Sequence, residues 1–461
     1  MFDDTIAAIS TPPGEGGIGI VRISGPAAMT IGKTIFSFNR QVKEPETHRL
    51  YYGKVINPSN NQVIDEALIS FMRAPHTFTR EDVVEVNCHG GILPLSKTLE
   101  IILASGARLA EPGEFTQRAF LNGRIDLAQA EAVIQIIRAK TETAMRLSAE
   151  QLTGRLSREV KEIRQILLSI LAHAEASIDF PEHQDVEEMA REEVERKTQE
   201  CIAKITQLLK TADQGRILRE GVRTAIVGLP NVGKSSLLNA LLREQRAIVT
   251  DIPGTTRDVL EESINLGGIA LTIIDTAGIR DTINEIERIG VERSRSVLAR
   301  ADLVLFVLDV TQGLSEDNIK LLHAVGEKPC IVIANKIDLL TASQNIIPKI
   351  KKAVEPRPLV AMSVLKAEGL ADLEKTIIEI VLQGKVNPTE SVMVTSTRHK
   401  NALKKANDAL YELQKSLAAG YAIDLLTIDL YTALNALGEI TGENVSSELV
   451  EEIFSNFCIG K

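Results

Sequence analysis

The stretch Gly228-Leu-Pro-Asn-Val-Gly-Lys-Ser235 fits the phosphate-loop pattern G-x-x-x-x-G-K-[ST], and the rest of the chain can be placed relative to it. Apolar residues 224–227 before the loop predict a buried strand, and residues 236–242 after it predict a helix. In this context backbone N–H groups surround the β-phosphate of a nucleotide, and the helix dipole favours negative charge. We therefore expect Lys234 to reach the β- and γ-phosphates and the Ser235 hydroxyl to bind Mg²⁺.

Two further motifs follow in the order typical of a GTP-binding domain. Strand-like residues 270–274 lead into Asp275-Thr-Ala-Gly278, which offers a carboxylate toward Mg²⁺ and a glycine that can sense the γ-phosphate. Strand-like residues 330–334 lead into Asn335-Lys-Ile-Asp338. The Asp338 carboxylate can accept hydrogen bonds from the N1–H and N2–H₂ groups of guanine, a donor pair that adenine lacks. The three motifs together predict a GTPase.

Composition sets the broad class of the protein. A length of 461 residues predicts about three domains, and 44% hydrophobic residues support real cores. The net charge of −10 argues against a chain that binds nucleic acid by itself, although a local basic face or a basic partner could still provide such binding. The cysteines indicate neither a zinc site nor a disulfide framework; they are Cys88, Cys201, Cys330 and Cys458. With no basic leader and no apolar run near ~20 residues, we expect a cytoplasmic protein that does not enter membranes.

Residues 1–120 predict an α+β N-terminal domain. The segment Gly14-Glu-Gly-Gly-Ile-Gly19 satisfies G-x-G-x-x-G, but residues 18–23 alternate as a strand, and Asn39-Arg40 stands where a dinucleotide-binding fold has an acidic residue. A glycine-rich hairpin is therefore favoured over a Rossmann unit. His89-Gly-Gly91 could form an oxyanion hole, but no G-x-S-x-G motif accompanies it, which argues against an esterase.

Helical patterns flank the GTPase segment on both sides. Residues 121–220 and 385–461 predict all-α structure around an α/β domain at 221–384. One long helix is predicted from the apolar stripe Leu152, Leu156, Val160, Ile163, Leu167, Ile170 and Ala174, ending before Pro181. Because each helical part is short of core by itself, we favour a GTPase domain inserted into one helical domain over two independent helical domains.

The whole chain resembles the MnmE (TrmE) family of tRNA-modification GTPases. The resemblance rests on the GTPase motifs and on residues 12–22 (PPGEGGIGIVR), 113–122 (GEFTQRAFLN), 126–132 (DLAQAEA) and 457–461 (FCIGK). It implies a folate-binding N-terminal domain that mediates homodimer formation, a discontinuous helical domain and the inserted GTPase domain. It also implies an FAD-dependent MnmG-type flavoprotein partner, with which the family adds an aminomethyl or carboxymethylaminomethyl group to C5 of the wobble uridine of certain tRNAs.

The resemblance assigns site residues that spacing alone does not. Its folate contacts, for 5-formyl- or methylene-tetrahydrofolate as one-carbon donor, match Arg22, Glu85, Arg124 and Lys461. Its water-activating carboxylate matches Glu287, which would replace the glutamine that small GTPases often carry where Ile279 stands here. Its K⁺ ligands match Asn231, Thr250, Ile252 and Thr255, while Thr256 joins Ser235 at Mg²⁺.

The predicted GTP contacts extend over five segments. They are Asn231, Val232, Gly233, Lys234, Ser235 and Ser236; Thr250, Asp251, Ile252, Pro253, Gly254, Thr255 and Thr256; Asp275, Thr276, Ala277 and Gly278; Asn335, Lys336, Ile337 and Asp338; and Ser363, Val364 and Leu365. The last segment departs from the usual Ser-Ala-Lys or Ser-Ala-Arg. Since the loop contacts guanine O6 largely through backbone N–H, Val364 should be tolerated at some cost in nucleotide affinity.

Two functional hypotheses remain open at this point. The first is a GTPase that acts in tRNA modification, with Cys458 near a bound folate and taking part in the chemistry. The second is a GTP-switched RNA-binding or ribosome-assembly factor with no chemistry beyond hydrolysis. The terminal cysteine motif and the N-terminal domain favour the first hypothesis, whereas a basic RNA-binding appendage would favour the second, and the sequence shows none. For Cys458 the alternative is an ordinary packing role.

Overall fold

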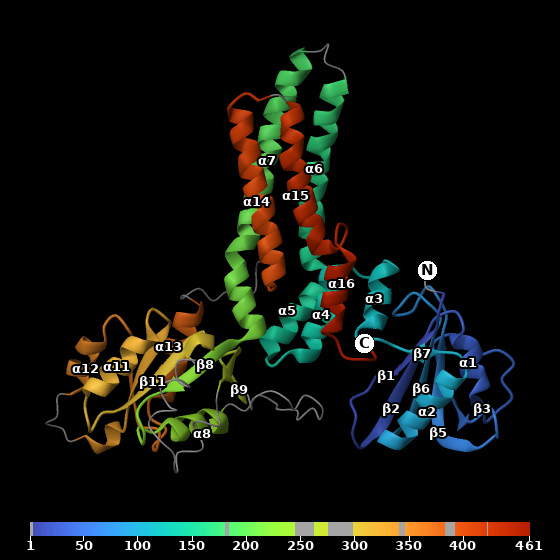
Figure 1. Ribbon diagram of the computed structural model, residues 1–461, viewed down its shortest axis with the longest axis horizontal. Coiled ribbons are helices and arrows are strands. Elements are labelled where there is room, and N and C mark those ends of the chain that lie inside the picture. The colour runs from blue at the N-terminus through green and yellow to red at the C-terminus, as the bar shows by residue number, and fades with distance from the viewer. Residues whose placement is uncertain are drawn as a thin grey trace.

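The computed structural model describes residues 3–179, 184–244, 262–274, 298–340, 346–382, 392–421 and 423–461. Three parts follow one another in space: a mixed sheet, a bundle of long helices and a second α/β unit (Figure 1). The predicted class, a multidomain chain with an α+β N-terminal domain, an all-α domain and an inserted P-loop α/β domain, is confirmed.

The N-terminal part is built on a sheet that has the strand order β3-β4-β5-β6-β2-β1-β7 in the described residues. Its strands are β1 (Ile6–Ile9), β2 (Gly16–Ser24), β3 (Phe36–Phe38), β4 (Arg49–Ile56), β5 (Val63–Met72), β6 (Val83–Gly90) and β7 (Arg108–Leu109). Helices α1 (Ala28–Thr34) and α2 (Ile92–Ala104) share one core with these strands. Strands β1 and β2 pair antiparallel, which confirms the glycine-rich hairpin predicted around Gly14–Gly19.

Helix α3 (Glu114–Leu121) is tied to this sheet by a buried arginine. The Arg118 side chain has no exposed surface, and its guanidinium lies 2.7 Å from Asp4 Oδ1, 3.2 Å from Glu81 Oε1 and 2.9 Å from Glu114 Oε1. A guanidinium removed from water needs partners of this kind, because an unpaired buried charge is costly. The start of α3 is therefore held in a fixed position beside β1.

The four long helices of the central bundle come from both sides of the GTPase segment. They are α6 (Arg155–Asp179), α7 (Gln184–Glu220), α14 (Thr397–Ala418) and α15 (Ile423–Thr441), and they stand side by side in Figure 1. Apolar residues of all four form a single core, so the predicted insertion of the GTPase domain is confirmed. The helices of each half pack on each other, and the two halves pack together through α7 on α14 and α6 on α15.

One part of the helical prediction is wrong. Residues 156, 160, 163, 167, 170 and 174 form the buried stripe of α6, but Leu152 is the last residue of the preceding helix α5 (Glu142–Leu152). Thr153 caps that helix, and Gly154 follows with φ +78°, a left-handed conformation that ends one helix and starts the next. The apolar spacing continues across the turn by coincidence, so periodicity alone does not reveal the break.

Two shorter helices attach the bundle to the rest of the chain. Helix α4 (Leu127–Arg138) begins with a capping box between Asp126 and Gln129, and α16 (Ser447–Ser455) packs Val450 and Phe454 against it. Glu131 of α4 also receives a hydrogen bond from Arg398 Nε at 2.7 Å and lies 2.9 Å from His399 Nε2, both on α14. Burial opposes ionisation of Glu131, but His399 and Arg398 lower its pKa to about 2.

The GTPase part is a sheet that, in the described residues, has the order β13-β12-β11-β8-β10-β9. Its strands are β8 (Val222–Val227), β9 (Glu262–Leu266), β10 (Ile269–Ile273), β11 (Leu303–Asp309), β12 (Cys330–Asn335) and β13 (Leu359–Met362). All neighbours are parallel except β9 and β10. Helices α8 (Lys234–Glu244) and α13 (Leu370–Leu382) cover one face, and α11 (Glu316–Val325) and α12 (Ile347–Val354) cover the other. Ligands of such sheets bind outside the carboxyl ends of the strands.

Candidate functional site

The phosphate-loop segment connects the end of β8 to the start of α8, as the sequence predicts. Both motif glycines are required by close approach as well as by conformation. Gly228 has φ +157°, and a Cβ on it would lie 2.2 Å from the carbonyl oxygen of Val307. Gly233 has φ +103°, and a Cβ there would lie 2.3 Å from Asn335 Nδ2. Any other residue at these two positions would displace a neighbouring strand or the asparagine.

Lys234 is the first residue of α8 and folds back over the loop. Its Nζ donates to the carbonyl oxygens of Gly228 at 2.9 Å and Leu229 at 2.8 Å. Burial lowers the pKa of the Lys234 ammonium, because the charged form loses water. An anionic phosphate beside it would favour the charged form again, so the site is electrostatically suited to a polyphosphate.

The predicted Asn335-Lys-Ile-Asp338 motif holds the loops together. Asn335, the last residue of β12, donates from Nδ2 to the carbonyl oxygen of Val232 at 2.8 Å and accepts at Oδ1 from the Val364 N–H at 3.2 Å. Lys336 adopts φ +68° and donates to Asp309 Oδ2 at 2.6 Å and to the carbonyl oxygen of Asn231 at 3.0 Å. Burial opposes ionisation of Asp309, but hydrogen bonds from Lys336 and Thr311 lower its pKa. The phosphate loop and the base-side loops are thereby fixed relative to each other.

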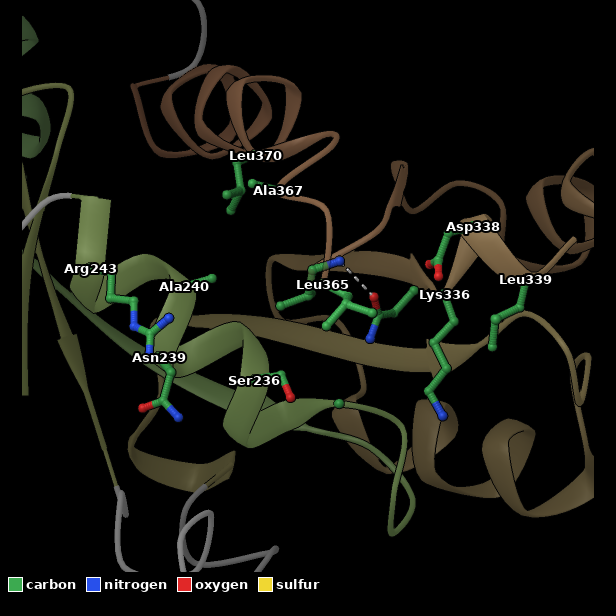
Figure 2. A pocket seen from close by; sticks show the side chains of 13 residues that line it. Ser236, Asn239, Ala240, Arg243, Lys336, Asp338, Leu339, Leu365, Ala367 and Leu370 are labelled. Carbon is green, nitrogen blue, oxygen red and sulfur yellow. Dashed lines mark hydrogen bonds between the residues drawn. The ribbon is translucent and has the colours of Figure 1, made fainter.

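A cavity of about 600 Å³ opens between these segments (Figure 2). Ser236, Asn239 and Arg243 of α8 line one side, and Lys336, Asp338 and Leu339 line the other; Gly233, Ala240, Asn335, Val364, Leu365, Ala367 and Leu370 complete the wall. Cavities of this size are typical of sites that bury a small molecule or cofactor. The structure therefore places the phosphate loop and Asp338 around one space that can accept a nucleotide.

Asp338 lies on the short 3₁₀ turn Ile337–Leu339, and one of its carboxylate oxygens accepts a hydrogen bond from a neighbouring loop. Ser363 is fully buried and donates from its hydroxyl to Asp338 Oδ1 at 2.7 Å. Val364 has only 9% of its surface exposed and belongs to the sheet core, while Leu365 is 89% exposed at the rim of the cavity. Valine in place of alanine is thus absorbed by the core; the predicted cost in nucleotide affinity stays a prediction.

Part of the predicted nucleotide site lies outside the described residues. This holds for Thr250, Asp251, Ile252, Pro253, Gly254, Thr255, Thr256, Asp275, Thr276, Ala277, Gly278 and Glu287. Of the predicted cation ligands, Ser235 is half-buried at the second position of α8, and Asn231 is exposed with φ +63°. Hydroxyl and amide oxygens are ligands that suit hard cations such as Mg²⁺ and K⁺, so the two described ligands fit the ions assigned to them.

A second group of predicted site residues meets in the N-terminal part. Arg22 on β2 faces Glu85 on β6, and its Nε and Nη2 both lie 2.8 Å from Glu85 Oε1. The Arg22 guanidinium carbon lies 5.7 Å from the ring centroid of Phe115 and 6.0 Å from that of Phe78. The Arg124 guanidinium carbon lies 4.8 Å from the Phe78 ring, and Arg124 Nη1 donates to the Phe78 carbonyl oxygen at 3.1 Å. Neither phenylalanine stands out in the sequence, where Phe115 is only one residue of the segment 113–122.

The C-terminal segment carries Cys458 and Lys461 to the same place. The Gly113 N–H donates to the Cys458 carbonyl oxygen at 3.3 Å, and the Phe115 N–H donates to the Lys461 carbonyl oxygen at 3.1 Å. Between them, Gly460 has φ +90° and packs so closely on β1 that a Cβ would lie 2.4 Å from the Ile9 carbonyl oxygen. Of the four predicted contacts, Arg22 and Arg124 thus lie beside the rings of Phe78 and Phe115, while Glu85 pairs with Arg22 and Lys461 meets Phe115 through its backbone.

The four cysteines have different surroundings. Cys88, Cys201 and Cys330 are buried, and burial raises the pKa of their thiols to about 11, 12 and 11. Cys458 is free and exposed. A thiol must be accessible to react, so Cys458 is the cysteine whose surroundings permit chemistry with a bound molecule.

Comparisons with known proteins find relatives along the whole chain. A family model described as the MnmE helical domain matches residues 127–458, and one described as the GTP-binding protein TrmE N-terminus matches residues 5–124. The "tRNA modification GTPase MnmE" of Desulforamulus reducens is 50% identical over 463 residues, covering 100% of both chains. That of Geobacillus thermodenitrificans is 50% identical over 461 residues, covering 99% of both.

Among solved structures, Aquifex aeolicus Era bound to GDP and AlF₄⁻ is 30% identical, with a TM-score of 0.28. The match covers 41% of this chain and 66% of that one.

Within the described ranges, no helix combines the length and apolar character needed to cross a bilayer.

Proposed function

The chain belongs to the MnmE family of tRNA modification GTPases. Within this family, we propose the following activity for it. It is a K⁺-stimulated GTPase that, with an FAD-dependent MnmG-type flavoprotein, adds an aminomethyl or carboxymethylaminomethyl group to C5 of the wobble uridine of certain tRNAs. A tetrahydrofolate in the 5-formyl or methylene form supplies the one-carbon unit. The protein works as a homodimer in the cytoplasm.

The observation that carries the nucleotide part is the cavity that Asp338 shares with the phosphate loop. Lys234 and the N–H groups at the start of α8 would bind phosphate oxygens, and Ser235 would contribute a hydroxyl to Mg²⁺. Asp338, held by Ser363, would accept hydrogen bonds from guanine. Glu287, which lies outside the described residues, is the proposed water-activating carboxylate.

The K⁺ part rests on Asn231. This residue lies in the phosphate loop, its side chain is exposed, and Lys336 fixes its backbone by donating to its carbonyl oxygen. When bound, K⁺ supplies positive charge where negative charge develops during hydrolysis. Asn231 would hold the ion by its amide oxygen together with Thr250, Ile252 and Thr255.

The folate part rests on the group around Phe78 and Phe115. A folate combines an aromatic pterin with glutamate carboxylates. This group offers two rings with Arg22 and Arg124 beside them, Glu85 as an acceptor, and Lys461, whose carbonyl oxygen accepts from the Phe115 N–H. Arginine can stack on an aromatic face and also bind a carboxylate in a bidentate manner, so the residues present suit this ligand. Exposed Cys458 would stand beside it.

The experiment that tests the function is a nucleoside analysis of tRNA from cells lacking this protein. We expect the C5 modification of the wobble uridine to disappear and to return when the intact gene is restored. The competing hypothesis, a GTP-switched ribosome-assembly factor, predicts unchanged tRNA nucleosides together with a defect in ribosomal subunits. Normal C5 modification in the deletion strain would refute the proposal.

Hydrolysis should depend on the monovalent cation. Replacing K⁺ by Na⁺ at equal ionic strength is expected to lower the GTPase rate at least about 10-fold, because the smaller, more strongly hydrated Na⁺ would not fill a site sized for K⁺, and the missing charge near the β–γ bridge would cost a few kcal/mol. Asn231→Ala should remove the difference between the two ions, whereas Asn239→Ala, on the α8 wall of the cavity, should retain it. A steady-state phosphate-release assay measures this. Equal rates in K⁺ and Na⁺ for the unmodified protein would contradict the assignment.

A further inference from the structure

Arg80 and Arg124 lie close together beside Phe78, at the edge of the proposed folate site. Arg124 is one of the proposed folate contacts, while Arg80 has no assigned role. Arg80 Nη1 donates to the Asn122 carbonyl oxygen at 2.9 Å, and Arg124 Nη1 donates to the Phe78 carbonyl oxygen at 3.1 Å. Each guanidinium thus reaches across to the segment that carries the other.

Segments 78–80 and 122–124 are fixed side by side. Asn122 Nδ2 donates to the Thr79 carbonyl oxygen at 2.7 Å, which adds a third hydrogen bond between them. A Cβ placed on Gly123 would lie 3.5 Å from Arg80 Nη1, so the Arg80 guanidinium rests directly against the residue that precedes Arg124. The hydrogen bonds between the two segments therefore hold the two guanidinium groups close together.

Nothing in the described part of the chain neutralises this pair. Neither guanidinium forms an ion pair there, and both use backbone carbonyls, which carry no net charge, as acceptors. The carboxylate next in sequence, Glu81, is turned inward, where it accepts from Ser24 Oγ at 2.7 Å and pairs with Arg118. Glu85 is likewise occupied by Arg22. Two adjacent guanidinium groups repel each other, and an anion between them would relieve that repulsion.

The backbone holds Arg80 outward at some cost. Arg80 has φ +60°, a left-handed conformation that is uncommon for a long side chain and is strained. The loop tolerates it because the flanking Thr79 and Glu81 are buried and hydrogen-bonded to Ser24. A strained residue in a rigid loop that presents an exposed cation suggests a binding role.

Resting on the folate site proposed above, we infer that Arg80 and Arg124 form a clamp for the carboxylates of a folate that carries more than one glutamate. The pterin end would lie at the rings flanked by Arg22, and the glutamyl chain would leave past Arg124 toward Arg80. Guanidinium groups bind carboxylates in a bidentate manner, and each of these has unused N–H groups. The net charge of −10 disfavours the alternative, a general contact with tRNA phosphates.

The test compares 5-formyltetrahydrofolate with one and with three glutamates by calorimetry on the full-length protein. We expect the triglutamate to bind at least about 10-fold more tightly, equivalent to about 1.4 kcal/mol. Arg80→Gly accepts φ +60° without strain and should reduce the ratio of the two dissociation constants to about 1. Arg80→Lys should keep part of the preference, since the charge remains without the planar fork. Arg40→Ala, another exposed arginine of the same domain, should keep all of it.

The outcomes separate the two levels of the proposal. If the unmodified protein binds neither form, the folate site itself is wrong. If it binds both forms with equal affinity, or if Arg80→Gly keeps the preference for triglutamate, only the clamp is overturned. Loss of tRNA affinity in Arg80→Gly without a change in the glutamate ratio would also overturn it, in favour of a phosphate contact.

Discussion

Asp338→Asn is expected to weaken GTP binding by about 10²- to 10³-fold and to shift the preference to xanthosine nucleotides. The carboxylate accepts from the N1–H and N2–H₂ groups of guanine, and an amide NH₂ would meet those donors with a donor. Xanthine has a carbonyl at C2, which prefers an amide donor. Because Asn retains an Oδ1 that can accept from the Ser363 hydroxyl, the base-side loop should keep its position, and the change should be confined to base choice.

Competition with a fluorescent GDP analogue measures this shift. GTP, ATP and XTP are titrated against the unmodified protein, against Asp338→Asn, and against Asp317→Asn as a control on the exposed start of α11. The control should keep its preference for GTP. An unmodified protein that binds ATP as tightly as GTP, or an Asp338→Asn variant that keeps its preference for GTP, would show that Asp338 does not select the base.

The parts of the molecule that could be predicted from sequence depend on local signals. Residues 224–227, 236–242 and 330–334 lie in the elements predicted for them, because an apolar run followed by a glycine or polar motif has one ready interpretation in a parallel sheet. The inserted topology was also predictable, since the apolar stripes in residues 156–174 and 403–437 each need a partner of similar length.

What sequence could not provide depends on tertiary contacts. The turn at Thr153-Gly154 interrupts an apolar spacing that looks continuous, and nothing before the fold shows that Arg80 and Arg124 meet. Phe78 becomes notable only when Arg22 and Arg124 are seen around its ring. The family resemblance named Arg22, Glu85, Arg124 and Lys461 but not the aromatic residues that they surround.

The GTPase domain and the C-terminal segment meet at the connection after α4. Lys140 Nζ donates to Ser263 Oγ on β9 at 2.7 Å, and Arg138 Nη2 donates to the Asn456 carbonyl oxygen at 2.6 Å, two residues before Cys458. Thr143 also packs against Gly268, in the turn between β9 and β10. Residues 138–143 therefore contact both the β9–β10 hairpin and the segment that carries the cysteine.

Cys458→Ser is expected to abolish tRNA modification, by at least about 100-fold, while GTP hydrolysis stays within about twofold. The substitution replaces one sulfur by oxygen, and the contacts that place the segment are made by backbone atoms of residues 458–461, so its position should not change. A serine hydroxyl is a far weaker nucleophile than a cysteine sulfur. The loss should therefore be chemical rather than structural.

Both activities are measured on the same preparation, with Ser455→Ala, at the exposed end of α16, as the neighbouring control. The control should keep both activities, because among the described residues Ser455 Oγ donates only to the Glu452 carbonyl oxygen of its own helix. Folate affinity distinguishes loss of the reactive group from damage to the folate site. A Cys458→Ser protein that binds folate normally but does not modify tRNA has lost the reactive group, because its ligand site is intact. Normal modification by this variant would mean that Cys458 only packs at the surface and that the reacting group must be sought among Arg22, Glu85 and the proposed flavoprotein partner.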